Sequence, residues 1–277
     1  MDVPLCAIIP VRNEADRVAH ALGQLHRAGI RRAVIVVNGS RDGSAAAARQ
    51  AVLRLRWAAR VLEFRPSLGP DVPRAVGTFA ALRAFPDTGW FLYADGDWGG
   101  GFGPMLQDWV SRAQRSGAQV TFVGNRTLRK DGSSDPERPD LQLWRTTLGR
   151  IQPAWRDVSP SESPWLVHRA AFHDVSAYWL HHPGQWFARC ALARERSIRL
   201  AVVRGWDPRL AGNRNRTESH ARRMLETLVG DAVEGCCVLL GRRPTRRWKG
   251  VWWNGYHADR RLDILRRVAG SWRPESP

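Results

Sequence analysis

The stretch Trp90-Phe-Leu-Tyr-Ala-Asp-Gly-Asp97 decides the fold, because a run of strand-forming apolar residues ends there in two carboxylates. Continuous apolar runs are typical of strands inside a parallel sheet, which is covered on both faces. We therefore expect Asp95 and Asp97 to emerge at the carboxyl end of a strand, where open α/β sheets bind ligands. Two carboxylates at that place suit a divalent cation such as Mg²⁺ or Mn²⁺, which shares its coordination with substrate phosphates.

Strands and helices are predicted to alternate along the first half of the chain. The expected strands span residues 6–10, 32–37, 60–64 and 90–95, and the expected helices span residues 13–28, 44–55 and 74–84. This alternation predicts an α/β fold with a doubly wound, mostly parallel sheet. Glu14, Asn38 and the two aspartates follow the first, second and fourth strands, so the sequence predicts a ligand-binding edge where they meet.

Length and cysteine content place the chain in a broad class. Its 277 residues suffice for one sizeable α/β domain with an appendage. No apolar run reaches the roughly 18 residues of a membrane span, and we expect no signal peptide. The four cysteines lack disulfide or zinc spacing, so they are predicted to be small core residues in a reducing, cytoplasmic compartment.

The formal charge of +17 comes almost entirely from arginine, since Lys130 and Lys249 are the only lysines. Arginine forms bidentate hydrogen bonds with phosphate, so phosphorylated substrates, anionic lipid surfaces and nucleic acid are all candidate ligands. A GC-rich genome would produce the same composition without any functional cause. Because the arginines are spread along the whole chain, the charge alone does not support nucleic-acid binding.

Three motifs in the first half carry a resemblance to a known family. They are Ile8-Ile-Pro-Val-Arg-Asn-Glu14, Val36-Val-Asn-Gly-Ser-Arg-Asp-Gly-Ser44 and Ala94-Asp-Gly-Asp97. Together they resemble the family 2 glycosyltransferases of the GT-A fold, which move a sugar from a nucleotide-diphospho-sugar. The resemblance covers roughly residues 4–125 and implies a Rossmann-like GT-A fold and a metal-dependent transferase, with UDP-sugars the first expectation for the donor and GDP-sugars the second.

The resemblance also implies a division of the chain. A GT-A domain would span residues 1–215, with a donor-binding half at 1–125 and an acceptor half at 126–215. A mainly helical extension rich in Trp and Arg would follow at 216–277.

Residues of the first two loops are implied to hold the nucleoside. Pro10, Arg12 and Glu14 would flank it, with Glu14 on the ribose. Asn38 would face the base where the family usually has Asp, and its amide offers both a donor and an acceptor.

The diphosphate and the metal are implied to lie further along the same edge. Gly69 and Arg74 belong to a stretch that resembles the family's Gly-rich loop and helix start, and a helix N-terminus with an arginine can bind an anion. Gly96 and Asp95 would contact the donor, and Asp95 and Asp97 the metal. His220 is the candidate for the C-terminal histidine that completes the metal site in many GT-A enzymes.

The catalytic base is left open. Residues 160–172 resemble the segment that lines the acceptor cleft, but Gln185 stands where inverting relatives carry a carboxylate, and an amide cannot accept the proton. Either another carboxylate serves, or the enzyme retains configuration, as relatives that glycosylate phosphoglycerate do. The candidates for the base are Glu162, Asp207 and Asp174, of which Glu162 is best placed.

The C-terminal part combines a clear helix, predicted at residues 218–240, with a segment of interleaved Trp and Arg at 242–256. That segment could seat the protein on the inner face of an anionic membrane for a lipid-linked acceptor, form a homodimer contact, or stack on nucleic-acid bases. Because Gly250 and Gly255 interrupt an amphipathic helix, internal packing is the favoured interpretation.

Two other functions remain alternatives to a glycosyltransferase with an unidentified, phosphorylated or lipid-linked acceptor. A sugar nucleotidyltransferase has a similar sheet but needs an N-terminal Gly-rich loop, which residues 10–14 do not form. A basic nucleic-acid-binding protein with a degenerate donor site would show salt-dependent binding of oligonucleotides.

Overall fold

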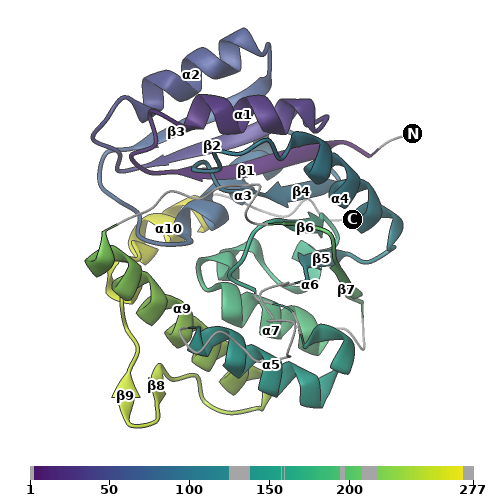
Figure 1. The fold of residues 1–277 in the computed structure, drawn as a ribbon, viewed down its shortest axis with the longest axis vertical. Helices are drawn as coiled ribbons and strands as arrows, with labels where there is room; N and C mark the ends of the chain where they lie inside the picture. The colour runs from purple at the N-terminus through teal and green to yellow at the C-terminus, as the bar shows by residue number, and fades with distance from the viewer. Residues whose placement is uncertain are drawn as a thin grey trace.

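A single mixed sheet forms the centre of the computed structural model, which describes residues 3–124, 138–156, 158, 160–193, 197–207 and 217–270 (Figure 1). Its strand order is β3-β2-β1-β4-β6-β5-β7. The strands are β1 (Leu5–Val11), β2 (Arg32–Asn38), β3 (Ala58–Phe64), β4 (Trp90–Tyr93), β5 (Val120–Val123), β6 (Trp165–His168) and β7 (Leu200–Val203). The helices are α1 (Val18–Arg27), α2 (Ser44–Arg54), α3 (Val72–Ala84), α4 (Gly103–Arg115), α5 (Pro139–Ile151), α6 (Ala171–Asp174), α7 (Pro183–Ala193), α9 (Glu218–Leu239) and α10 (Leu262–Gly270).

The sheet is mostly parallel, as the sequence predicts. Strand β1 pairs in parallel with β2 and β4, and β2 pairs in parallel with β3. Strand β6 is reversed between β4 and β5, with Trp165 opposite Tyr93 and His168 opposite Trp90. Residues just before β6 therefore lie at the edge where β4 ends, and residues just after β6 lie at the opposite edge.

One predicted boundary and one omission in the first half need correction. Helix α1 begins at Val18 rather than Asn13, because Asn13 has a left-handed backbone (φ 55°) and uses its side chain to accept from the Arg41 N–H at 2.8 Å. Helix α4, which begins at Gly103, is absent from the predicted elements.

Helices cover both faces of the sheet, and each face has its own apolar core. Helices α1, α2 and α4 pack on one face, where Leu22 and Trp109 are fully buried. Helices α3, α7 and α9 pack on the other, around a stack of the Trp165 and Trp186 rings whose centroids lie 6.1 Å apart. All four cysteines are free; the prediction of small core residues is confirmed for the three that are buried, and Cys237 is only half-buried.

The C-terminal extension folds back onto the donor half of the chain. Helix α9 confirms the helix predicted at 218–240, and α10 packs against α3 (Figure 1). Leu265 of α10 belongs to the same core as the sheet, so this part is continuous with the α/β body. The predicted domain boundary at residue 215 lies outside the described residues.

Between α9 and α10 lies a hairpin of β8 (Arg247–Trp248) and β9 (Val251–Trp252). Lys249 and Gly250 both have positive φ angles, as tight two-residue hairpin turns require. The predicted internal packing of this segment is confirmed for Arg246, which is buried, and is wrong for Trp252, which is 60% exposed. Among the described residues, no helix has the length and apolar character needed to span a membrane.

Candidate active site

The loops after β1 and β4 meet at the carboxyl edge of the sheet, as predicted. The Gly96 N–H donates to the Pro10 carbonyl at 3.2 Å. A Cβ atom on Gly96 would come within 2.8 Å of the Glu14 carboxylate, so the two loops are in direct contact. Glu14 is itself buried, and its N–H donates to the Ser44 hydroxyl at 2.8 Å. The loop after β2 therefore supports the loop after β1.

Asp97 is more deeply buried than Asp95. Arg17 donates to the Asp97 carbonyl at 3.3 Å, and Asp97 is only 8% exposed. The next residue, Trp98, is buried against Trp206, with ring centroids 4.8 Å apart. Asp95 is more open, which leaves its carboxylate accessible from the ligand-binding edge.

Arg74 at the start of α3 reaches Asp95, which places it where the sequence predicted a basic residue. Its Nη2 lies 3.0 Å from Asp95 Oδ1 and 3.2 Å from the Ser163 hydroxyl, and its Nη1 pairs with Asp71. The guanidinium stacks over Trp165, 5.0 Å from the ring centroid. Burial alone would lower the pKa of Arg74, but the two carboxylates raise it above its ordinary value. The group therefore keeps its positive charge beside the acidic turn.

Asn38 and Gly69 are brought together at the same edge. The Asn38 Oδ1 accepts from the Leu68 N–H at 2.6 Å, and its Nδ2 donates to the Gly69 carbonyl at 3.1 Å. In the structure this amide holds the loop that leads into α3, and its contact with a base stays a prediction. Of the other predicted nucleoside residues, Pro10 is half-buried in β1 and Arg12 is exposed at its end.

The candidate bases differ in their position relative to the acidic turn. Glu162 precedes β6 and so lies at the edge of Asp95, where its carboxylate pairs with Arg138 at 3.0 Å. Burial raises the pKa of Glu162, although the Arg138 charge opposes that shift. Asp207 follows β7, directly after the tryptophan that packs on Trp98. Asp174 is exposed on α6, after β6, and so lies at the opposite edge from the acidic turn.

His220 lies in the first turn of α9, where its Nδ1 is 2.8 Å from the Tyr256 hydroxyl. Its predicted role as a metal ligand stays a prediction. The basic loop before it, residues 208–216, lies outside the described residues. Gln185 is buried in the first turn of α7.

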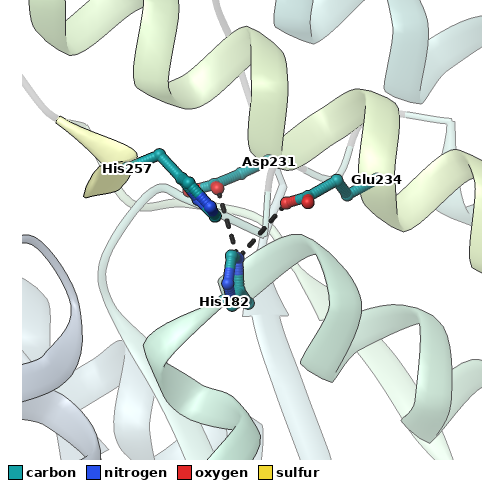
Figure 2. A group of neighbouring side chains, drawn as sticks. All are labelled: His182, Asp231, Glu234 and His257. Carbon is teal, nitrogen blue, oxygen red and sulfur yellow. Dashed lines mark ion pairs between the residues drawn. The ribbon is translucent and has the colours of Figure 1, made fainter. Parts of the chain in front are cut away.

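A buried polar cluster behind the site was missed at the sequence level. His182, Asp231, Glu234 and His257 place their ligand atoms within 4.8 Å of one another (Figure 2). The signal that could have revealed it is the pair of carboxylates three residues apart inside the otherwise apolar pattern of α9. Burial lowers the pKa of His257 to about 4, aided by the charges of nearby arginines.

Two arginine side chains already occupy this cluster. Arg246 Nη1 lies 2.7 Å from Asp231 Oδ1 and 3.0 Å from Glu234 Oε2. Arg260 Nη2 lies 2.6 Å from Asp231 Oδ2. Burial alone would raise the pKa of Asp231, but Arg260, His182 and Arg246 hold it well below its usual range. A divalent cation here would stand beside two guanidinium groups, so we interpret the cluster as an ion-pair network rather than a metal site.

Comparisons with known proteins place the chain by its fold. No model of a protein family matches the chain, and no curated protein matches its sequence. Glucosyl-3-phosphoglycerate synthase from Mycobacterium tuberculosis, in complex with Mn²⁺, UDP and phosphoglyceric acid, is similar with a TM-score of 0.57 at 15% identity, covering 84% of this chain and 78% of that one. The same enzyme with Mg²⁺ and UDP is similar with a TM-score of 0.55 at 16% identity, over 88% and 81% of the two chains. The chain thus has the GT-A fold that its three motifs predict.

Proposed function

We propose that the protein is a metal-dependent glycosyltransferase that moves a sugar from a nucleotide-diphospho-sugar to an acceptor hydroxyl. The observation that carries this proposal is the convergence of Glu14, Arg74 and the Asp95–Asp97 turn at one edge of the sheet. A GT-A fold alone would be compatible with other activities. The fold together with this set of side chains favours the transferase over a nucleotidyltransferase or a nucleic-acid-binding protein.

The acidic turn fits a divalent cation by the chemistry of its donors. Asp95 and Asp97 offer hard oxygen ligands, which Mg²⁺ and Mn²⁺ prefer. When bound, the metal would neutralise the nucleoside diphosphate as it departs. Arg74 would contribute a second fixed positive charge at the same place, and its burial strengthens that effect.

The residues of the acceptor half would handle the proton of the acceptor hydroxyl. As the bond between the anomeric carbon and the diphosphate oxygen breaks, the acceptor oxygen bonds to that carbon and releases its proton. In an inverting reaction Glu162 takes that proton, since it lies at the correct edge and burial raises its pKa. Asp207 is the second candidate. In a retaining reaction the proton goes to the departing phosphate oxygen.

We propose a UDP-sugar as the donor and a small phosphorylated molecule as the acceptor. One solved structure of the same fold, at a TM-score of 0.59 and 15% identity, holds UDP-glucose and phosphoglyceric acid with Mn²⁺. The net charge of +17 supports an anionic acceptor. A GDP-sugar is the second choice of donor.

A thermal-shift screen of UDP, GDP, ADP and dTDP, each with and without Mn²⁺, tests the proposal. A nucleotide at 100 times its Kd stabilises a protein by about 2.7 kcal/mol, which raises the midpoint of a chain of this size by several degrees. The control is Asp97→Asn, which keeps the shape of the side chain but removes its charge and should abolish the metal-dependent shift. If none of the four nucleotides shifts the midpoint with metal, the donor-site assignment is wrong.

A further inference from the structure

A continuous line of ion pairs runs from the acidic turn to the C-terminal extension. Asp95 pairs with Arg74 at 3.0 Å, and Arg74 pairs with Asp71. Asp71 pairs with Arg260 at 3.3 Å, and Arg260 pairs with Asp231 of α9 at 2.6 Å. The line ends in the cluster of Figure 2, which it enters at Asp231. Acidic and basic groups alternate along it, so each charge is flanked by opposite ones.

These side chains are withdrawn from water. The side chains of Arg260 and Asp231 are each 1% exposed, and those of Arg74 and Asp71 are 11% and 12% exposed. Buried arginines keep their charge, and a carboxylate that bonds to two of them has little freedom to reorient. Only Asp95, with a side chain 30% exposed, opens toward the ligand-binding edge.

Hydrogen bonds to backbone carbonyls hold the extension against the loop that leads into α3. The Arg261 N–H donates to the Leu68 carbonyl at 2.9 Å, and Arg260 Nε donates to the Pro70 carbonyl at 3.4 Å. Gly69 has a φ of +80°, and a Cβ atom there would come within 2.4 Å of the Asp259 carbonyl. Residues 259–261 thus pack against the loop that leads into α3, and the Arg260 side chain bonds to Asp71.

Asp71 is the link between the two halves of this line. It stands at the N-cap position of α3 with a left-handed backbone, at φ 62° and ψ −24°. One carboxylate oxygen pairs with Arg74 and the other with Arg260. Asparagine tolerates this backbone conformation well, so the charge of the side chain can be removed there without straining the chain.

We propose that Asp71 and Arg260 are positioning residues that hold the Arg74 guanidinium at Asp95 and thereby set the affinity for the donor diphosphate. This inference rests on the proposed function, because it takes Arg74 and Asp95 to face the donor. Without the carboxylate of Asp71, the long Arg74 side chain regains rotamers that donor binding must then freeze. The extension is on this account part of the donor site.

Calorimetric titration of the full-length protein with UDP in the presence of Mn²⁺ tests the proposal. The variants are Asp71→Asn and Arg260→Lys; lysine keeps the charge but cannot bridge two carboxylates as a guanidinium does. The matched control is Arg246→Lys, because Arg246 is also buried and also pairs with Asp231. Within the described part of the chain its other bonds go to Glu234 and to the carbonyls of Thr227 and Trp253, not to Asp71.

We expect Asp71→Asn and Arg260→Lys to weaken UDP binding about tenfold, the factor that corresponds to one charge-assisted hydrogen bond. Arg246→Lys should lower the unfolding midpoint but leave UDP affinity unchanged. In an Arg74→Lys background, Arg260→Lys should weaken binding no further, because the side chain that it positions is already altered. A purely structural role would make the two losses independent and additive.

The results of this titration distinguish a failure of this inference from a failure of the proposed function. If the unmodified protein binds no UDP with Mn²⁺, the proposed function fails and the inference fails with it. If the unmodified protein binds UDP and the Asp71→Asn and Arg260→Lys variants bind it equally well, only the inference fails. Should Arg260→Lys not fold, Asp71→Asn carries the test. Loss of affinity in Arg246→Lys to the same degree would also overturn the inference.

Discussion

Replacing Gly96 with alanine should damage the acidic turn by a purely steric effect. Its backbone is not in the left-handed region, so alanine is compatible with its φ angle. The added Cβ atom would lie 2.7 Å from Val11 Cγ2, 2.8 Å from Glu14 Oε2 and 2.9 Å from the Pro10 carbonyl. Contacts under 3.0 Å are not tolerated, so the loops after β1 and β4 must move apart.

The size of the effect follows from what that movement disturbs. The Pro10 carbonyl accepts the Gly96 N–H at 3.2 Å, so separating the loops also lengthens this hydrogen bond. Overpacking of this kind costs about 1–3 kcal/mol, which lowers the midpoint of a chain of this size by roughly 2–12 °C. The same shift displaces Glu14 from the turn, and each 1.4 kcal/mol lost from donor binding weakens it about tenfold.

The assay pairs thermal unfolding with calorimetric titration of UDP and Mn²⁺, and the chain offers a matched control. Gly101 lies five residues further on, and a Cβ atom there meets nothing within 4 Å. Gly101→Ala should be neutral or stabilise by up to about 1 kcal/mol, through the reduced freedom of the unfolded chain. Equal midpoints and equal UDP affinities for the two alanine variants would refute the contact between the two loops.

Three further predictions concern other parts of the molecule. Burial and the neighbouring charge of His182 lower the pKa of His181 to about 3. Between that value and about pH 6.5 only the unfolded chain binds the proton, so the free energy of unfolding should fall with falling pH by up to about 1.4 kcal/mol per pH unit. Urea unfolding of His181→Gln should show a weaker dependence of the free energy of unfolding on pH in this range. In an inverting reaction, Glu162→Gln should lower the transfer rate by about 10²–10⁴-fold, whereas Asp174→Asn at the opposite edge should leave the rate unchanged; NMR of the product anomer checks the stereochemistry independently. Because Trp252 is exposed on a basic hairpin, the protein should sediment with phosphatidylserine vesicles and the Trp252→Ala variant should not. Equal binding of the protein to neutral vesicles would contradict binding to an anionic surface.

The donor half could be predicted because its signals are local. A buried parallel strand is apolar on both faces, so residues 32–37 and 90–95 are recognisable without their neighbours. Polar residues that follow such strands must gather at one edge, which is why the approach of Glu14 to the Asp95–Asp97 turn was foreseen. The start of α1 was misplaced because the left-handed backbone of Asn13 depends on its bond to Arg41, a tertiary contact.

The acceptor half could not be read in the same way, because its arrangement depends on pairing between distant segments. The run Trp165–His168 has the same apolar pattern whichever way it lies in the sheet. Only its pairing with β4 shows that it is reversed, and that reversal places Glu162 at the acidic turn and Asp174 away from it. A choice among the candidate bases therefore requires the topology.

Three of the many arginines have a specific structural role, whatever the origin of the arginine excess in genome composition. Arg74, Arg246 and Arg260 are buried, and each bonds to acceptors on two segments, which for Arg246 are α9 and the Trp253 carbonyl. A lysine ammonium is a compact, strongly hydrated charge, so it could neither span two carboxylates in a fixed plane nor lose water so readily. Breaking one partner from a buried pair costs about 3–5 kcal/mol, because the remaining charge stays uncompensated. Arg74 and Arg260 therefore join the extension to the sheet edge through charge, whereas Arg246 ties together parts of the extension itself. Replacing each by lysine tests geometry while leaving net charge the same.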